Sequence, residues 1–351
     1  MLKYWPKKSS NKLITKGDPL IPHIFTAVAI IFYLVAAQSP ASAQRIRAAS
    51  GGLSVIHSLL WAPYEQKLMK KYGIDMEYIA IESGTVGMQT LVANQSQFLF
   101  STGSLAVNAN LVGADITIVA GGLNFIPDKL IARPEIKTPE DFKGKKIAIS
   151  RFGSSSEVNL RICLEKLGVK PELTQIIQVG GVSTRQTALL AGQVDATILS
   201  DPQATAATKN GMKLMVDLAD AKWGFPRYCH NCFMAKRSYL ESNREQATNF
   251  IKAVIEGLYL MKRDKPLAIR LIKKYLRFDD ESASIGYDFY IAKHGEGLLS
   301  LPERRGLEFV ITEVAKTNPK AAGATPDSLK LVEPSILDDI KKSGFIERVK
   351  G

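Results

Sequence analysis

The fold is decided by residues 45–85, RIRAASGGLSVIHSLLWAPYEQKLMKKYGIDMEYIAIESGT. Residues 45–49 predict a short strand that ends at a glycine pair, and residues 61–72 predict a helix from the spacing of their apolar side chains. Gly73 follows this helix where a left-handed residue is favoured. Apolar and acidic residues alternate at 74–78, which predicts a second strand. The stretch is therefore a strand–helix–strand unit, which is typical of a parallel α/β sheet.

Similar units continue to about residue 120, and a second series begins near residue 138, so the sequence predicts two α/β lobes. The second series opens at Thr138-Pro139-Glu140-Asp141, where a hydroxyl cap, a proline and two acids mark a helix start. Each lobe is expected to be a mostly parallel sheet flanked by helices. The expected boundaries are 44–131 for the first part of lobe 1, 132–225 for an inserted lobe 2, and 226–351 for a return strand and C-terminal helices of lobe 1.

Composition excludes several classes of protein. The 351 residues are 46% hydrophobic and 23% charged, which excludes a disordered chain, a collagen-like repeat and a polytopic membrane protein. Three cysteines are too few for a disulfide scaffold. The net charge of +12 raises nucleic acid as a partner, but the lysines form short separate clusters and no basic stripe with interleaved aromatics. We therefore expect a solvated basic surface and no nucleic-acid partner.

The N-terminal segment has the three parts of a secretory signal. Five lysines precede residue 20, an apolar run follows at 21–37, and Ala41-Ser42-Ala43 is a cleavage motif. We expect a signal peptide at 1–43, cleavage before Gln44 and a periplasmic mature protein. The alternative is an uncleaved helix that anchors the protein to the membrane, facing the periplasm, although a stretch of 17 residues with a proline near its start is at the short limit for a span.

Small polar residues follow five of the predicted strands and begin helices. In open parallel sheets these loops lie at one edge, where ligands bind, and helix N-termini offer unpaired N–H groups there. Two lobes that face each other with such loops form a cleft suited to a small anion. For any single loop the alternative is that the residues only cap a helix. The clusters are Ser50-Gly51-Gly52, Ser83-Gly84-Thr85, Thr102-Gly103-Ser104, Gly153-Ser154-Ser155-Ser156 and Gly180-Gly181-Val182-Ser183-Thr184.

No pattern of catalytic or metal-binding residues accompanies these loops, so we expect no enzyme, cofactor or metal. His57 follows the first strand and is a candidate cleft residue, but no Ser/Asp partner at a triad spacing accompanies it. The sequence contains neither a P-loop nor an H-E-x-x-H motif. Cys229-His230-Asn231-Cys232 leaves three interpretations open, namely buried or loop thiols, a disulfide, or a metal site.

Three segments resemble the nitrate/sulfonate/taurine-type periplasmic substrate-binding proteins, in the superfamily shared with thiamine-pyrimidine synthases. They are A-P-Y-E-Q-K-L-M-K-K-Y-G-I-D-M-E at 62–77, T-P-E-D-F-K-G-K-K-I-A at 138–148, and L-A-G-Q-V-D-A at 190–196 followed by Asp201-Pro202. The resemblance implies the two-lobed periplasmic-binding-protein type II fold, with crossing strands near 130–134 and 223–233. It also implies a monomer that closes on a small ligand and docks to an ABC permease with a separate ATPase.

The resemblance also implies which residues contact a sulfonate, nitrate or carboxylate ligand. Arg185 is either a ligand-binding residue or a solvated residue in the first turn of a helix. Three aromatic residues either stack on the ligand or belong to the core, namely Trp61, Phe125 and Phe152. A rival expectation is a thiamine-pyrimidine-precursor binding protein or a pyrimidine synthase, although most of the synthases' C-C-C-F-C motif is absent from C-H-N-C-F at 229–233. The expected ligand-binding residues are Ser54, His57, Gly84, Thr85, Thr102, Gly103, Ser104, Asn124, Ser154, Ser155, Arg185 and Asp201.

Overall fold

The computed structural model describes residues 44–351. The predicted signal peptide, its cleavage site and the alternative anchor helix lie outside the described residues. Within residues 44–351, no helix is both long enough and apolar enough to cross a membrane.

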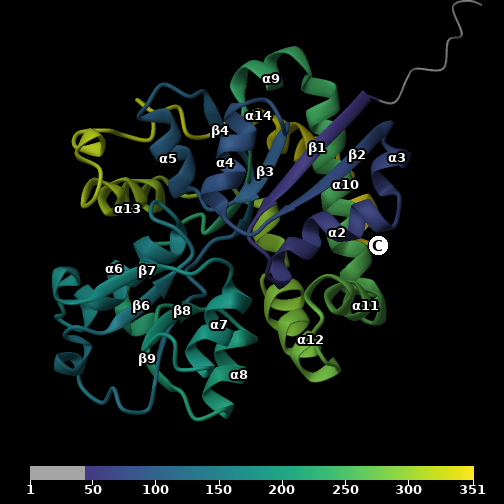
Figure 1. The fold of residues 1–351 in the computed structure, drawn as a ribbon. Coiled ribbons are helices and arrows are strands. Elements are labelled where there is room, and N and C mark those ends of the chain that lie inside the picture. The colour runs from purple at the N-terminus through teal and green to yellow at the C-terminus, as the bar shows by residue number, and fades with distance from the viewer. Residues whose placement is uncertain (1–43) are drawn as a thin grey trace, which may run out of the picture. The chain divides into compact units, whose positions relative to one another are not determined.

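Two five-stranded sheets organise the described chain (Figure 1). The first sheet has the order β2-β1-β3-β10-β4, and only β10 runs antiparallel to its neighbours. Its strands are β1 (Gln44–Gly51), β2 (Ile74–Ile81), β3 (Phe98–Ser101), β4 (Ile116–Leu123) and β10 (Asn231–Lys236). The fold is therefore the expected α/β type with a mostly parallel sheet.

The second sheet has the same pattern, with the order β7-β6-β8-β5-β9 and β5 antiparallel to both of its neighbours. Its strands are β5 (Lys129–Ala132), β6 (Lys146–Ile149), β7 (Gln175–Gln178), β8 (Ala196–Leu199) and β9 (Lys213–Asp217). Because Ile131 pairs with Thr197 of β8, the boundary predicted after residue 131 falls inside a strand of this sheet. The chain passes from one sheet to the other at 124–128, a few residues earlier than predicted, and returns at 218–230.

Helices flank both sheets. The predicted helix at 61–72 is instead two helices, because Lys67 has a left-handed backbone with φ of 56°. A π-helical segment from Tyr287 to Lys293 directly follows the helix at Asp280–Gly286. The helices are α2 (Ser58–Glu65), α3 (Leu68–Lys71), α4 (Gly84–Val92), α5 (Ser104–Asn110), α6 (Ser155–Lys166), α7 (Val182–Leu190), α8 (Gln203–Lys209), α9 (Arg237–Ser242), α10 (Arg244–Arg263), α11 (Lys265–Leu276), α12 (Asp280–Gly286), α13 (Arg304–Ala315), α14 (Ser335–Lys342) and α15 (Phe345–Lys350).

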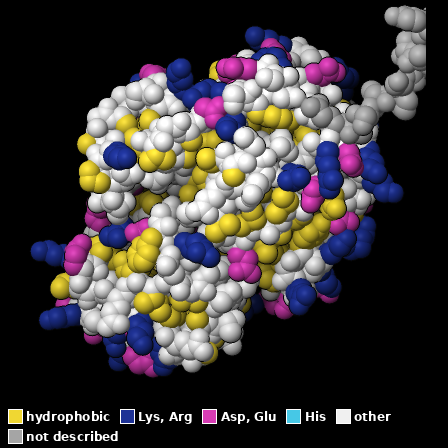
Figure 2. Space-filling view, turned by 45° about the horizontal axis from the view of Figure 1, so that its top comes forward, with side chains coloured by type: hydrophobic (Ala, Val, Ile, Leu, Met, Phe, Trp, Pro, Cys, Tyr) yellow, Lys and Arg dark blue, Asp and Glu magenta, His cyan; other side chains and the backbone are white. Residues whose placement is uncertain are grey.

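The two lobes share part of their hydrophobic core. One buried cluster includes Leu99 of β3, Ile147 of β6 and Val310 of α13, so apolar packing continues from one sheet to the other around the crossing segments. At the surface, Figure 2 shows lysine and arginine side chains interspersed with acidic ones on the face in view. The crossing segments at 124–128 and 218–230 contribute to this shared core, so the two lobes pack against each other where the chain passes between them.

Candidate functional site

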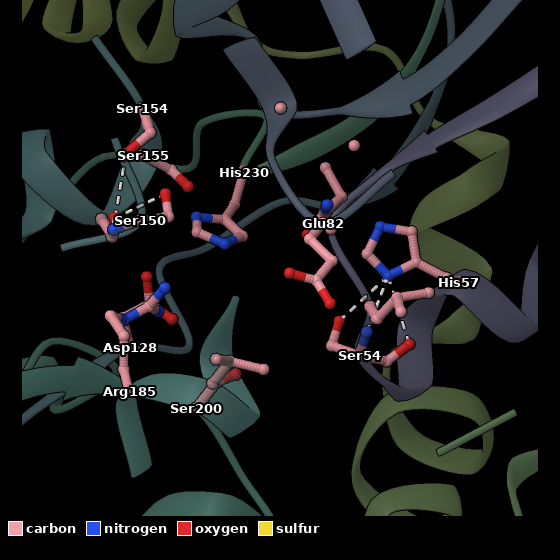
Figure 3. Close-up of a pocket in the computed structure, with 17 residues that line it drawn as sticks. Ser54, His57, Glu82, Asp128, Ser150, Ser154, Ser155, Arg185, Ser200 and His230 are labelled. Carbon is pink, nitrogen blue, oxygen red and sulfur yellow. Dashed lines mark hydrogen bonds between the residues drawn. The ribbon is translucent and has the colours of Figure 1, made fainter. Parts of the chain in front are cut away.

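A polar cavity of about 90 Å³ lies between the two sheets (Figure 3). This is several times the space that one buried water needs. The first lobe contributes the loops that follow β1 and β2, and the second lobe contributes those that follow β6, β7 and β8. The carboxyl ends of the parallel strands therefore face the cavity from both sides, as the strand-end rule predicts for α/β sheets.

Half of the residues expected to bind the ligand lie at this cavity. Gly84 contributes backbone, and Ser154 and Ser155 lie at the N-terminal end of α6. Arg185 is buried in the first turns of α7, so the interpretation as a solvated residue is wrong. The expected residues that line the cavity are Ser54, His57, Gly84, Ser154, Ser155 and Arg185.

The loop after β3 does not reach the cavity, which corrects the expectation for Thr102, Gly103 and Ser104. The chain returning from the second lobe covers this loop, and the Gly103 amide donates to the Cys229 carbonyl oxygen at 3.2 Å. A Cβ atom at position 103 would lie 3.1 Å from that oxygen. The pairing of β10 with β3 brings the covering segment here, so the loop is a buried packing site.

Three further expected residues lie outside the cavity. Asn124 donates its amide to Ser300 Oγ at 2.6 Å, which ties the first crossing to the C-terminal region. Asp201 forms an ion pair with Lys129 at 2.7 Å inside the second lobe. Thr85 lies in a neighbouring apolar groove between α4 and α5. The side chains of Asn124 and Asp201 are thus engaged in packing the fold, and Thr85 faces a different surface.

The structure also places residues at the cavity that were not expected there. Asp128 ends the first crossing segment and His230 ends the second, so both crossings contribute to the cavity wall, and Asn231 at the start of β10 adjoins them. Glu82 directly follows β2, and the strand-end rule applied to charged residues would have found it. No local pattern marks Asp128 or His230, because their position depends on how the two lobes are joined.

His57 is buried at the cavity as a neutral imidazole. His57 Nδ1 lies 3.1 Å from the Ser54 backbone nitrogen and 3.2 Å from the Ser54 carbonyl oxygen, so it accepts from the first or donates to the second according to the tautomer. Burial lowers the pKa of His57 from 6.5 to about 4, a hydrogen bond to the Ser54 carbonyl oxygen opposes this shift, and the nearby His230 adds to it. Within residues 44–351, His57 Nε2 is a buried nitrogen without a hydrogen-bond partner. It is available to hydrogen-bond a ligand from an uncharged ring.

The depressed pKa of His57 predicts an acid-sensitive stability. Above pH 6.5 the ring is neutral in both the folded and the unfolded chain, and between pH 6.5 and about 4 only the unfolded chain binds the proton. The free energy of unfolding therefore falls as the pH is lowered, by roughly 2 kcal/mol from this residue between pH 7 and 5. Urea denaturation at both pH values should show a smaller decrease for His57→Gln. Equal decreases in the two proteins would contradict the assignment.

Arg185 carries the positive charge of the cavity wall. Its Nε and Nη2 atoms donate to the Ile198 carbonyl oxygen at 3.3 and 3.0 Å, and Nη1 donates to the Gly180 oxygen at 2.6 Å. Burial lowers its pKa to about 10, and the charge of Asp128 opposes this shift. The guanidinium has five N–H donors and uses three here, so two remain for a ligand.

Serine hydroxyls form a second polar wall in the same lobe as Arg185. Ser156 Oγ accepts from the Ser150 amide at 2.8 Å and lies 2.9 Å from Ser154 Oγ, which itself donates to the Arg151 carbonyl oxygen. These bonds hold the loop after β6 against the first turn of α6. The unpaired amides of that turn and the serine hydroxyls favour an acceptor group of a ligand.

The three aromatic candidates differ in their surroundings. Trp61 is fully buried, stacks on Tyr275 with ring centres 4.5 Å apart, and donates its Nε1–H to Tyr78 Oη at 2.8 Å. It is therefore a core residue of the first lobe. Phe125 packs against His294 at 4.5 Å, and Phe152 is half-exposed. None of the three is among the residues that line the cavity.

Cys229 and Cys232 are buried free thiols in the structure. Cys229 precedes β10, and its Sγ donates to the Asn231 carbonyl oxygen at 3.3 Å. Burial raises the pKa of the Cys229 thiol, and its hydrogen bond with Cys232 adds to this effect. Residues 44–351 contain no cluster of three or more His, Cys, Asp or Glu side chains that could hold a metal ion.

The sequence profile of the NMT1/THI5-like family matches residues 64–266, more than half of the chain. The chain belongs to the NMT1/THI5-like family. A relative from Brucella abortus (strain 2308), named as a provisional binding protein, is 26% identical to this NMT1/THI5-like chain over 238 residues, 67% of the chain and 71% of the relative. The taurine-binding periplasmic protein of Escherichia coli (strain K12) is 24% identical over 202 residues, 56% of the chain and 60% of that protein.

Two solved structures have the same fold as this NMT1/THI5-like chain. The periplasmic nitrate-binding protein from Synechocystis PCC 6803 has a TM-score of 0.67 at 12% identity and covers 85% of the chain, with 88% of its own chain matched. A desulfurization enzyme has a TM-score of 0.60 at 12% identity and covers 85% of the chain, with 99% of its own chain matched. The chain thus has the periplasmic-binding-protein fold, and its relatives include binding proteins of import systems.

Proposed function

We propose that this protein is the substrate-binding component of an ABC importer, which captures a small solute between its lobes and delivers it to a membrane permease and, indirectly, its ATPase. The observation that carries the proposal is the cavity, which is lined by strand-end loops of both lobes. A ligand held there contacts both sheets at once, so binding couples to the arrangement of the lobes. Two relatives that are named as periplasmic binding proteins support the same role.

The proposed ligand has an anionic group, of the sulfonate, nitrate or carboxylate type. The two free N–H donors of Arg185 and the first turn of α6 are the groups that favour an anion. We propose that the protein is exported by cleavage of residues 1–43 and acts as a periplasmic monomer. After this cleavage, the charged side chains on the surface of the mature protein contact solvent and the permease.

We propose binding without chemical conversion, although one solved structure of the same fold is an enzyme. Two groups at or beside the cavity that could act as a base or a nucleophile lie in surroundings that oppose this role. Burial lowers the pKa of His57 to about 4, and burial and hydrogen bonding raise the pKa of the Cys229 thiol. Neither environment activates the group for acid–base or nucleophilic catalysis near neutral pH.

The proposed function predicts stabilisation by a small solute. Thermal shift with taurine, alkanesulfonates, nitrate and small carboxylates should show a compound that stabilises the protein by about 2.7 kcal/mol at a hundredfold excess over its Kd. Ser155→Trp fills the cavity and should remove the shift. Ser183→Trp, at an exposed position of α7, is the matched control and should retain it.

Two outcomes would contradict this proposal. A compound whose stabilisation is equal in wild type and Ser155→Trp binds elsewhere, so the cavity is not the binding site. A compound that mass spectrometry finds converted during incubation with the protein, at more than one equivalent, indicates an enzyme.

A further inference from the structure

Asp128 is a buried carboxylate at the cavity wall. It is 8% exposed and lies directly before β5, at the point where the chain enters the second lobe. Asn159 Nδ2 of α6 donates to Asp128 Oδ2 at 2.6 Å. Among residues 44–351, no lysine, arginine or histidine nitrogen lies within the 4.0 Å of its carboxylate that defines an ion pair. Within residues 44–351, the uncharged Asn159 amide is therefore the side chain that directly stabilises the Asp128 carboxylate.

The surroundings of Asp128 leave this charge without a cationic partner. Arg185 is close enough to interact electrostatically, but its bonded N–H groups are directed to the carbonyl oxygens of Ile198 and Gly180. His230 and His57 are buried, which favours their neutral forms. A buried charge without a partner of opposite charge lowers the stability of a fold. Proteins therefore keep such a charge mainly where a bound group supplies the opposite charge.

A second carboxylate faces the cavity from the opposite lobe. Glu82 follows β2, and a Cβ atom added at Gly181, directly before α7, would lie 3.6 Å from Glu82 Oε2. Figure 3 shows Glu82 on the side of the cavity opposite to Asp128 and Arg185, with His230 between them. The wall therefore carries two carboxylates and one guanidinium. A simple inorganic anion would meet more negative than positive charge there.

We propose that Asp128 is a specificity-determining residue that binds a cationic nitrogen of the solute, of the ammonium or amidinium type. The solute then carries a positive group toward Asp128 and an acceptor group toward Arg185 and α6. This inference rests on the proposed function and adds a positively charged group to the proposed anionic ligand. The charged donor completes the hydrogen bonds and the charge of Asp128 in the closed cavity, where such bonds are strongest.

The alternative is that Asp128 serves only as the acceptor that holds Asn159 of α6. Asp128→Asn separates the two roles, because an asparagine side-chain oxygen still accepts from Asn159 while the negative charge is lost. If the charge is held for a ligand, this variant makes the ligand-free protein more stable. If Asp128 has only the packing role, the stability of the ligand-free variant does not increase.

The experiment uses pairs of compounds that differ in one group. Taurine and isethionate are sulfonates with an ammonium or a hydroxyl group, and β-alanine and 3-hydroxypropionate are the corresponding carboxylates. Calorimetric titration should show that wild type binds the ammonium member of a pair at least about tenfold more tightly. Asp128→Asn should reduce this preference to roughly threefold or less by weakening the ammonium member alone.

Asp201→Asn is the control, because Asp201 is paired with Lys129 outside the cavity. It should lower the melting temperature and leave the preference within each pair unchanged. Asp128→Asn should instead raise the melting temperature of the ligand-free protein. This readout supports or opposes the proposal even if none of the four compounds binds.

The proposal is overturned if the hydroxyl members bind as tightly as the ammonium members, or if Asp128→Asn weakens both members equally. It is also overturned if Asp128→Asn lowers the melting temperature of the ligand-free protein. Binding of isethionate or nitrate in the cavity, removed by Ser155→Trp, would leave the proposed function standing while this inference fails. Absence of any cavity binding would instead oppose the proposed function.

Discussion

Arg185→Met is expected to lower the free energy of unfolding by about 3–5 kcal/mol. The substitution leaves the carbonyl oxygens of Ile198 and Gly180 buried without their donors, and each such group costs roughly 1–3 kcal/mol. It also removes the cation whose field acts on Asp128. Because the affected backbone groups end β8 and precede α7, the cavity wall should lose its shape and its ligand affinity together.

Urea denaturation followed by circular dichroism measures this effect. Arg151→Met is the matched control, because Arg151 is exposed and the same charge is lost at the surface. Its unfolding free energy should change by less than about 0.5 kcal/mol. Arg185→Lys should recover only part of the stability, since one ammonium group cannot reproduce the planar fork of donors. A loss below about 1 kcal/mol for Arg185→Met would show that water replaces the guanidinium.

Gly306→Ala is expected to destabilise the protein by about 3 kcal/mol or more. A Cβ atom at this position of α13 would lie 2.0 Å from the Arg227 carbonyl oxygen and 2.7 Å from Tyr228 Cα. Both atoms belong to the backbone of the second crossing segment, which cannot move aside as a flexible side chain could. This segment leads directly to His230 and Asn231 at the cavity, so ligand affinity should fall as well.

The sign of this result distinguishes close packing from local propensity. Alanine is ordinarily favoured over glycine in a helix by roughly 0.5–1 kcal/mol, so a variant free of clashes would be more stable than wild type. Arg305→Ala, the neighbouring exposed position of α13, is the control and should unfold at nearly the wild-type temperature. A rise in the melting temperature for Gly306→Ala would show that α13 does not press on the crossing segment.

Stability and function are linked at this site because the cavity lies where the lobes are joined. Asp128 ends one crossing segment and His230 the other, while α13 packs against the second. Substitutions in the crossing segments therefore affect the core and the ligand at once. Substitutions in the strand-end loops, such as Ser155→Trp, should act on the ligand with a smaller effect on folding.

Local pattern in the sequence was enough to predict the two-lobed α/β fold and several of the loops that line the cavity. Strand and helix periods are short-range properties, and parallel strands end at a common edge, so loops after β1, β2, β6 and β7 could be assigned to one rim. Gly84, Ser154 and Ser155 lie in loops that this rule selects, whereas Ser54 and Arg185 were expected from the family resemblance. The resemblance of segments such as 138–148 to a known family predicted the same fold.

Tertiary structure decided which of these loops stay open and what charge the cavity carries. The loop at Gly103 obeys the same local rule as the others, but the pairing of Cys232 with Ser101 places Cys229 over it. Asp128 and His230 reach the cavity because two segments about a hundred residues apart cross between the lobes. Pairing between distant strands is set by burial and register summed over the whole chain, which no local period of residues encodes.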